Sequence, residues 1–371
     1  MIDALLVLNT GSSSLKFQAF ARETLDQLIA GKVLGIGSAA VFQADMQDQP
    51  QLQRRLSRSD HESALAEVIN HIDRHDENWR LNAIVHRVVH GGVEFTHPVV
   101  VTPQILECLK ALSPLAPLHQ PHNLAGIAAS SRIAPDALDI ACFDTAFHAG
   151  RAQLFECFAL PRKFHDQGIR RYGFHGLSYE WIARCLQNDR PDLAAGKVVV
   201  AHLGNGASLC AISGGRSVDT TMGMTALDGL PMGSRCGALD PGVVTHLDRS
   251  GLDANEIDRL LYEESGLKGL SGISNDVATL LASTDPAACF ALDYFILKIA
   301  QFVAGMTVSL GGLDALVFTA GIGENAAPIR DGVVDRLMFM PTFETLVIPT
   351  NEEKMMAIHA NELLEHAACA G

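Results

Sequence analysis

The chain has 371 residues, of which 48% are hydrophobic, and this length and composition favour a globular protein with two domains. Its formal net charge of -14 disfavours nucleic acid as a partner, because binding a phosphate backbone requires an excess of lysine and arginine on one face. The eight cysteines form no C-x-x-C pair, so we interpret them as reduced thiols and not as a disulfide framework.

The N-terminal residues 1–4 lead directly into an apolar stretch at residues 5–8, without the basic region or the cleavage site of a signal peptide. The longest apolar region, residues 291–313, is interrupted by charged and amide side chains and predicts an amphipathic or core helix, not a membrane span. We therefore expect a cytoplasmic protein that has no membrane partner.

Two segments, residues 5–17 and 198–210, share one pattern. Each has a continuous apolar strand, a turn of glycine, asparagine and serine, and a second strand with apolar–polar alternation, which is typical of a β-hairpin. About half the chain separates them, which indicates an ancient duplication with one hairpin in each domain. The alternative is a pair of unrelated hairpins in an α/β protein, and the pattern alone leaves it open.

Between and after the hairpins, predicted strands alternate with predicted helices, which is typical of a layered α/β architecture. The polar residues 45–59 predict an excursion on the surface, and residues 350–353 carry the N-cap signal of a C-terminal helix. The predicted strands are residues 81–89, 138–143 and 315–318, and the predicted helices are residues 62–74, 103–112, 179–186, 255–264, 286–310 and 351–366.

The turn over residues 9–16 combines three serines, a glycine and Lys16, and so offers a phosphate backbone N–H groups, hydroxyls and one cation. The sequence has no G-x-x-x-x-G-K-[ST] motif, which excludes a Walker-type phosphate loop. Ser13 and Lys16 have the spacing of the penicillin-binding nucleophile motif. We reject that interpretation because they lie in a hairpin and no Lys-Thr-Gly partner motif exists.

Two further turns are rich in glycine. Residues 204–208 would let the backbone come close to an anion, since glycine has no side chain, and residues 319–325 follow an apolar strand. One Gly-x-Gly turn is a weak signal, but three such turns in one chain predict two phosphate sites and one nucleoside site facing a single cleft.

Arg87, Asp144, His175 and Arg235 each lie beside glycine or at the end of an apolar strand. Arginine and aspartate are rarely buried unless they are paired. One interpretation is structural, with Arg87 and Asp144 forming an ion pair in the core. The other is functional, because two arginines, a histidine and an aspartate in such contexts indicate a shared anionic substrate.

Together these segments resemble the acetate kinase family, which belongs to the acetate and sugar kinase, heat-shock protein and actin superfamily. The resemblance covers nearly the whole chain. It rests on motifs that occur in a fixed order, at residues 9–16, 86–92, 116–119, 143–148, 171–176, 202–206, 232–237, 272–276, 320–325 and 349–353.

The resemblance implies an α/β fold of two actin-like (ribonuclease H-like) domains with a central active-site cleft, assembled as a homodimer. The N-terminal domain would be residues 1–146, completed by the C-terminal helix 352–371, and the nucleotide-binding domain would be residues 147–351. The implied activity is reversible phosphoryl transfer between ATP and acetate, giving acetyl phosphate and ADP. The implied partners are a short-chain carboxylate and ATP with Mg²⁺, or with Mn²⁺ as the alternative ion.

The same resemblance assigns roles to residues. Arg87, Asp144, His175 and Arg235 would be catalytic, with His175 and Arg235 stabilising the transition state. The acyl substrate would contact Arg87, Val89, Leu118 and Phe174, and Mg²⁺ would be organised by Asn9 and Glu352 with Asp144. The nucleotide would contact Lys16, His202, Gly204, Asn205, Gly206, Asp276, Gly321, Ile322, Gly323 and Asn325.

A carboxylate is already a competent nucleophile at neutral pH, so this chemistry requires no strong general base. Catalysis would consist of in-line positioning and neutralisation of the charge on the phosphoryl oxygens. We therefore expect direct transfer without a phosphoenzyme.

The chain departs from the family pattern at four places, one of which is a segment over residues 337–346 that is shorter than in most members. After His175, residues 177–179 read Leu-Ser-Tyr where the family usually has Thr-Ser-His. Ala226 replaces a common proline of the acetate pocket, and the extra space would admit one more methylene, so that propionate would be a substrate too. Val277 and Ala278 follow Asp276 where an aromatic residue and an arginine are usual, which predicts that other nucleoside triphosphates are accepted.

Two alternatives accompany the acetate kinase interpretation. A propionate or other short-chain fatty acid kinase differs only in the acyl pocket. A non-catalytic actin-like nucleotide-binding module would keep the three turns but would have no reason to keep Arg87, His175 and Arg235 together.

Overall fold

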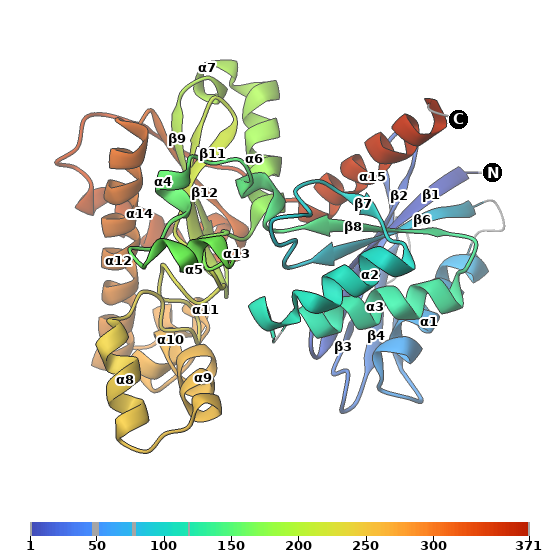
Figure 1. Ribbon diagram of the computed structural model, residues 1–371, viewed down its shortest axis with the longest axis horizontal. Coiled ribbons are helices and arrows are strands. Elements are labelled where there is room, and N and C mark those ends of the chain that lie inside the picture. The colour runs from blue at the N-terminus through green and yellow to red at the C-terminus, as the bar shows by residue number, and fades with distance from the viewer. Residues whose placement is uncertain (1, 47–51, 76–78, 118, 370–371) are drawn as a thin grey trace. The chain divides into compact units, whose positions relative to one another are not determined.

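A computed structural model of the protein describes residues 2–46, 52–75, 79–117 and 119–369 (Figure 1). The chain forms two compact units. Unit 1 comprises Met1–Ala146 together with Asn351–Gly371, and unit 2 comprises Phe147–Thr350. The C-terminal helix therefore returns to the unit that contains the N-terminus.

Unit 1 is built on a mixed sheet, and its described residues contribute eight strands in the order β5-β4-β3-β2-β1-β6-β8-β7. The hairpin of β1 and β2 is antiparallel, while β1, β6 and β8 run parallel. The strands are β1 (Ile2–Thr10), β2 (Ser14–Ala21), β3 (Gln27–Leu34), β4 (Val41–Met46), β5 (Leu52–Arg55), β6 (Trp79–Val88), β7 (Val99–Val100) and β8 (Leu138–Phe143), and the helices are α1 (His61–His75), α2 (Pro103–Ala111), α3 (Gln120–Ile133) and α15 (Glu352–Cys369).

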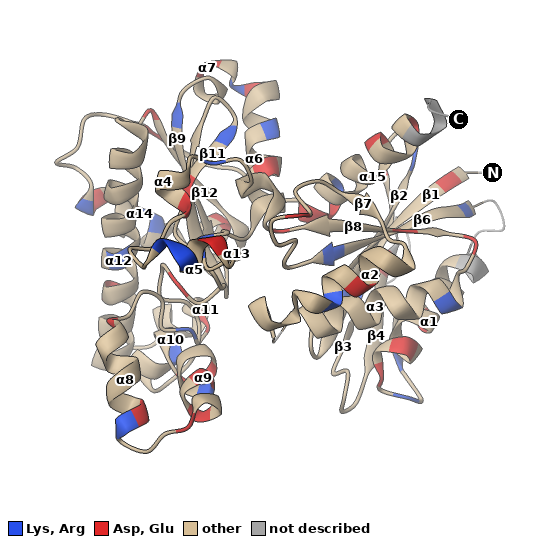
Figure 2. Cartoon of the chain, viewed as in Figure 1, with Lys and Arg blue, Asp and Glu red and all other residues tan. Residues whose placement is uncertain are grey.

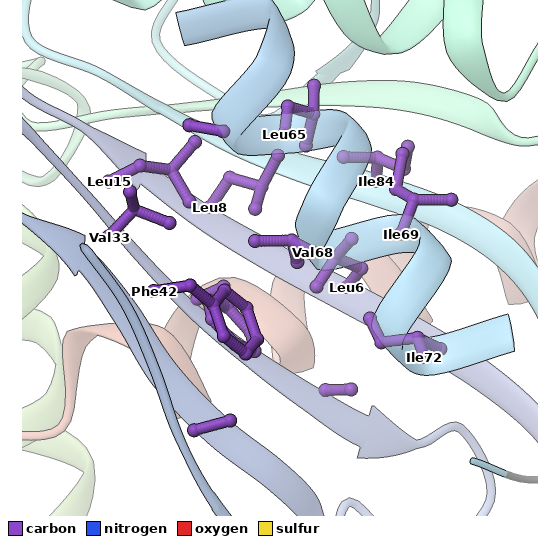
Figure 3. Packing of buried hydrophobic residues seen from close by; sticks show 14 of the residues in the cluster. Leu6, Leu8, Leu15, Val33, Phe42, Leu65, Val68, Ile69, Ile72 and Ile84 are labelled. Carbon is purple, nitrogen blue, oxygen red and sulfur yellow. The ribbon is translucent and has the colours of Figure 1, made fainter. Parts of the chain in front are cut away.

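Helices cover both faces of the centre of this sheet (Figure 1). α1 and α3 pack on one face, and α15 contacts β1, β6 and β8 from the other. Leu6 and Leu8 of β1 lie against α1 in the buried cluster of Figure 3, because alternate residues of a strand point to the same face. The helix contributes residues at the spacing of one helical face, which are Leu65, Val68, Ile69 and Ile72.

Unit 2 contains a smaller mixed sheet, whose described strands have the order β11-β10-β9-β12-β13. Its strands are β9 (Lys197–Leu203), β10 (Ala207–Ser213), β11 (Arg216–Thr220), β12 (Ala315–Thr319) and β13 (Glu344–Val347). Its helices are α4 (Gln153–Glu156), α5 (Arg162–Asp166), α6 (Gly176–Asp189), α7 (Pro191–Ala194), α8 (Pro241–Arg249), α9 (Ala254–Glu263), α10 (Gly266–Ser271), α11 (Val277–Leu281), α12 (Pro286–Leu310), α13 (Ala320–Asn325) and α14 (Ala327–Arg336).

Both predicted hairpins are confirmed, and they occupy the same place in their sheets. β1 and β2 pair from Ala4↔Ala21 to Thr10↔Leu15, and β9 and β10 pair from Lys197↔Ser213 to Leu203↔Ala207. In each unit the first hairpin strand also pairs with a parallel strand, β6 in unit 1 and β12 in unit 2. This common β-hairpin-plus-parallel-strand arrangement is what a duplication would produce.

α12 is the helix of the described part of the chain that is long and apolar enough, by length and composition, to cross a membrane. It packs on β9, β10 and β11, and Phe295, Ile299 and Val303 are among its buried residues. These contacts are those of a core helix. The segment predicted as a surface excursion also contains a strand, β5, which pairs with β4 and is exposed along its length. Its Leu-Gln-Arg-Arg sequence lacks the apolar alternation that would have revealed an edge strand.

Candidate active site

In unit 1, the predicted site residues gather where parallel strands end. Asn9 lies near the end of β1, Arg87 near the end of β6, and Asp144 directly after β8. β6 pairs with both other strands, so the three positions are neighbours. Charged residues are sparse on the central strands (Figure 2), and the carboxyl ends of parallel strands are where open α/β sheets bind ligands.

Arg87 and Asp144 form a two-pronged ion pair. Arg87 Nε donates to Asp144 Oδ1 at 2.9 Å and Nη2 donates to Oδ2 at 2.6 Å, while Nη1 lies 3.4 Å from Asn9 Oδ1. The Asp144 side chain is buried and that of Arg87 is 20% exposed. The structural interpretation of Arg87 is therefore correct as far as the pairing goes, and the pair lies at the carboxyl end of the parallel strands with part of the Arg87 side chain exposed.

Carboxylates crowd around this pair. The pKa of Glu352 is raised to about 7, chiefly by burial and also by the Asp144 and Glu353 carboxylates, against the lowering effect of Arg87. The pKa of Arg87 is raised, because Asp144 and Glu352 outweigh the effect of its burial. Glu352 occupies the first turn of α15, which Asn351 caps by accepting a 2.9 Å hydrogen bond from Lys354 N. Unit 1 thus holds more negative charge at this point than Arg87 alone can neutralise.

No group of three or more histidine, cysteine, aspartate or glutamate side chains in the described residues has the arrangement of a metal site. Mg²⁺ does not require such a group, because it keeps several waters and takes one or two carboxylates together with phosphate oxygens. Asp144, Glu352 and the amide oxygen of Asn9 supply that kind of oxygen donor. The residues present therefore fit a nucleotide-bound Mg²⁺ and do not fit an all-protein metal cage.

Two polar residues that sequence reasoning missed hold the strand ends in place. Asn123 of α3 accepts a hydrogen bond from Val89 N at 3.2 Å and donates to Thr10 O at 2.8 Å, so it links β1 to the residue after β6. Gln120 binds both the N–H and the carbonyl of His90. Both side chains are buried. In the sequence they look like ordinary polar residues of a helix, because these strand-end partners lie 30 or more residues away.

Lys16 and the residues predicted to contact the acyl substrate differ in how far they are exposed. Lys16 is exposed on β2 directly opposite Asn9. Val89 is 7% exposed, and Phe174 of unit 2 is buried with its carbonyl bound to His148 Nε2 at 2.9 Å. Leu118, the remaining predicted substrate residue, lies outside the described residues.

In unit 2, His175 and Arg235 meet at the turn between β9 and β10. A Cβ placed on Gly206 would lie 3.4 Å from His175 Nε2 and 3.9 Å from Arg235 Nη1. His175 has a left-handed backbone with φ 57° and precedes α6, which begins three residues earlier than predicted. The turn thus lies within van der Waals distance of both an imidazole nitrogen and a guanidinium, two groups that can face an anion.

The segment that carries Arg235 is tied to the same turn. Arg235 Nη1 donates to Ala226 O at 3.0 Å, and Gly233 N donates to Asn205 O at 3.1 Å. A Cβ on Gly233 would lie only 2.0 Å from Asn205 Oδ1. Close backbone approach at Gly233 thus fixes the guanidinium next to the turn.

A cavity of about 510 Å³ extends from this turn toward α11 and α14. Six predicted nucleotide residues line it, namely Gly204, Asn205, Asp276, Gly321, Ile322 and Asn325. His202, Gly206 and Gly323 lie beside it without lining it, and Lys16 belongs to unit 1. The apolar part of the lining was not fully predicted and consists of Val277, Ala278, Leu281, Ala326 and Pro328. The volume of the cavity is that of a small-molecule site.

A second cavity of unit 2, of about 550 Å³, lies between α12 and the segment that includes Cys236. No residue predicted from the sequence as part of the site lines it. The candidate site is therefore the smaller cavity, because that cavity adjoins His175 and Arg235.

Comparison with known proteins shows the family of this chain. A model described as the acetokinase family matches residues 4–344. A protein of Rhodopseudomonas palustris (strain TIE-1) named acetate kinase is 50% identical over 352 residues, which cover 92% of this chain and 87% of that protein. An acetate kinase of Methylocella silvestris is 44% identical over 412 residues and covers both chains fully.

Solved structures match over nearly the whole chain. The acetate kinase of Porphyromonas gingivalis has a TM-score of 0.87 at 32% identity, covering 98% of this chain and 100% of that one. A propionate kinase from Francisella tularensis has a TM-score of 0.89 at 35% identity, covering 96% and 99%. The predicted two-domain, actin-like α/β fold is thereby confirmed.

Proposed function

The chain belongs to the acetokinase family, and from this premise we propose that it transfers a phosphoryl group reversibly between ATP and acetate, giving acetyl phosphate and ADP. The observation that carries the proposal is the meeting of His175 Nε2 and Arg235 Nη1 at the Gly206 turn, beside the nucleotide-sized cavity. A non-catalytic nucleotide-binding module would have no use for those two groups at that point.

The reaction needs no proton transfer. An acetate oxygen attacks the γ-phosphorus of ATP as the bond to the bridging oxygen breaks, and that electron pair leaves with ADP. Arg235 and the Nε2 hydrogen of His175 would neutralise the charge on the transferred phosphoryl group. The planar guanidinium of Arg87 suits the acetate carboxylate and holds it for in-line attack. We propose direct transfer, without a phosphorylated carboxylate at Asp144 or Glu352.

We propose Mg²⁺, or Mn²⁺ in its place, as the ion that accompanies ATP. Asp144 and Glu352, with Asn9, would hold it, and when bound it supplies positive charge to the nucleotide phosphates. The excess of carboxylates around Arg87 supports this assignment, because the pKa of Glu352 is raised first by burial and then by the neighbouring carboxylates, and a cation would counter both effects.

Propionate is the second candidate substrate. Ala226 lacks the ring of the proline that is usual at this position, and its carbonyl holds Arg235. An additional methylene is worth only about 1–3 kcal/mol of discrimination, so a slightly larger pocket would accept both acids. The similarity to a solved propionate kinase supports this second candidate.

We further propose a homodimer that is cytoplasmic and binds neither nucleic acid nor membrane. The net charge of -14 supports the exclusion of nucleic acid. Large apolar side chains exposed on α12, namely Phe290, Leu297 and Val308, support an interface between copies of the chain.

A hydroxylamine trap for acyl phosphate tests the function. The protein is incubated with Mg-ATP and acetate, propionate or butyrate, and we expect the most hydroxamate from acetate. Arg235→Ala should lower the rate about a hundredfold, corresponding to about 3 kcal/mol for one preorganised donor. Arg249→Ala, which removes an exposed arginine of α8, is the matched control and should change nothing. No hydroxamate from any acid would refute the proposed function.

A further inference from the structure

Tyr179 is connected to His175 through one serine. Tyr179 follows His175 by one turn of α6, is completely buried, and its hydroxyl lies 2.5 Å from Ser208 Oγ. Ser208 sits on β10, two residues after Gly206, and its Oγ lies 2.8 Å from His175 Nδ1. A continuous path of hydrogen bonds thus runs from the core of unit 2 to the ring that faces the phosphate turn.

The imidazole of His175 is also held on its face. It stacks on His202 with ring centroids 4.1 Å apart and planes inclined by 18°. His202 is itself fixed, because its Nδ1 lies 2.8 Å from Ser178 Oγ, and Ser178 Oγ lies 2.8 Å from Thr350 Oγ1. The stack sets the plane of the His175 ring, and the bond to Ser208 sets its rotation within that plane.

The role of His175 Nε2 as a hydrogen-bond donor sets which group donates and which accepts at each step from Tyr179 to His175. A neutral imidazole donates from one nitrogen and accepts at the other. For Nε2 of His175 to donate to a phosphoryl oxygen, Nδ1 must accept the Ser208 proton. A serine hydroxyl has a single proton, so its oxygen is then open to accept the proton of Tyr179, and 2.5 Å is within the range of an O–H···O bond.

We propose that Tyr179 is a positioning residue for phosphoryl transfer. Through Ser208, its hydroxyl holds His175 in the tautomer that carries its hydrogen on Nε2. The inference rests on the proposed function and deepens it, since it says which form of His175 meets the phosphoryl group. The family pattern usually has histidine at this position, so the phenol of this chain does with one O–H donor what an imidazole N–H would do.

Activity measurements on four variants test the role. Tyr179→Phe and Ser208→Ala should each lower kcat about 10- to 100-fold, the range for partners that orient a functional histidine, and leave KM for acetate and ATP within about twofold. The double variant should be no slower than the single ones, because both changes break the same path. Tyr179→His should restore most of the activity.

Tyr172→Phe is the matched control. It also removes a tyrosine hydroxyl, one that donates to Gly168 O at 2.8 Å and has no place in the path. This control should keep the wild-type kcat. Thermal unfolding of each variant separates a loss of folding from a loss of positioning.

The tautomer itself is measured by long-range ¹H–¹⁵N NMR of the histidine-labelled protein, with the His175 signals assigned by their loss in His175→Gln. We expect the hydrogen on Nε2 in the wild type and a mixture of tautomers in Tyr179→Phe. A hydrogen on Nδ1 in the wild type overturns the proposal, and so does a Tyr179→Phe variant with unchanged kcat. If the wild type formed no acyl phosphate, the proposed function would fail, while the NMR result would still decide whether Tyr179 controls the tautomer.

Discussion

Replacing Arg87 should lower both the free energy of unfolding and the activity, and the two losses have different causes. Its guanidinium makes two hydrogen bonds to Asp144, whose side chain is only 2% exposed. In Arg87→Ala the carboxylate of Asp144 loses its cation while Glu352 and Glu353 remain close by. Breaking a buried ion pair in this way costs about 3–5 kcal/mol, because a charge is left without compensation. For domains of this size that corresponds to a fall in Tm of about 6–20 °C.

The double variant Arg87→Ala/Asp144→Ala provides the contrast. It removes the pair as a whole, so no new unpaired charge is left and most of the lost stability should return. Activity should not return, since under the proposed function the acetate carboxylate loses its guanidinium and the proposed Mg²⁺ site loses an oxygen donor. The assay is thermal unfolding followed by hydroxamate formation for the wild type, both single variants and the double variant.

Two results would refute this reasoning. If Arg87→Ala unfolds at the wild-type temperature, the pair does not neutralise a buried charge. If the double variant regains activity together with stability, Arg87 and Asp144 form a structural pair and have no role in phosphoryl transfer.

Three further predictions concern unit 2. Burial and the nearby Arg151 lower the pKa of His148 to about 3. Because the unfolded chain binds the proton below about pH 6.5, the free energy of unfolding should fall as the pH drops from 6.5 toward 3, by up to about 1.4 kcal/mol per pH unit. The melting temperature of His148→Gln should therefore depend less on pH than that of the wild type. Val277 and Ala278 line an apolar wall of the cavity proposed for the nucleotide, so kcat/KM for GTP and ITP should lie within about tenfold of that for ATP, and a hundredfold preference for ATP would contradict this. Gly233→Ala should raise KM for ATP, because its Cβ would displace Asn205; unchanged ATP kinetics would show that this contact does not shape the site.

Much of the fold could be predicted from local sequence patterns. The hairpins of residues 5–17 and 198–210 follow from apolar runs around glycine turns, and α12 follows from a long apolar stretch between Asp285 and Gly311. These features depend on neighbours in the chain, and local pattern is what propensity and periodicity report. The edge strand β5 was missed because it has no apolar alternation.

The candidate site was predicted in outline. Motif order pointed to Arg87, Asp144, His175 and Arg235, and six of the expected nucleotide residues line one cavity. Their roles in binding and catalysis remain predictions. The apolar wall of that cavity could not be foreseen in full, because Leu281 and Pro328 resemble ordinary residues of a helix and a helix start.

Sequence by itself therefore determined which elements form and which residue types are available for chemistry. Only the tertiary structure decided how those residues pair. Asn123 links two strand ends, Arg87 makes two hydrogen bonds to Asp144, and Tyr179 is connected to His175 through Ser208. The physical reason is that a hydrogen bond depends on distance and direction to within a fraction of an ångström. Partners such as Tyr179 and Ser208, 29 residues apart, acquire that geometry only when a helix has packed on a sheet.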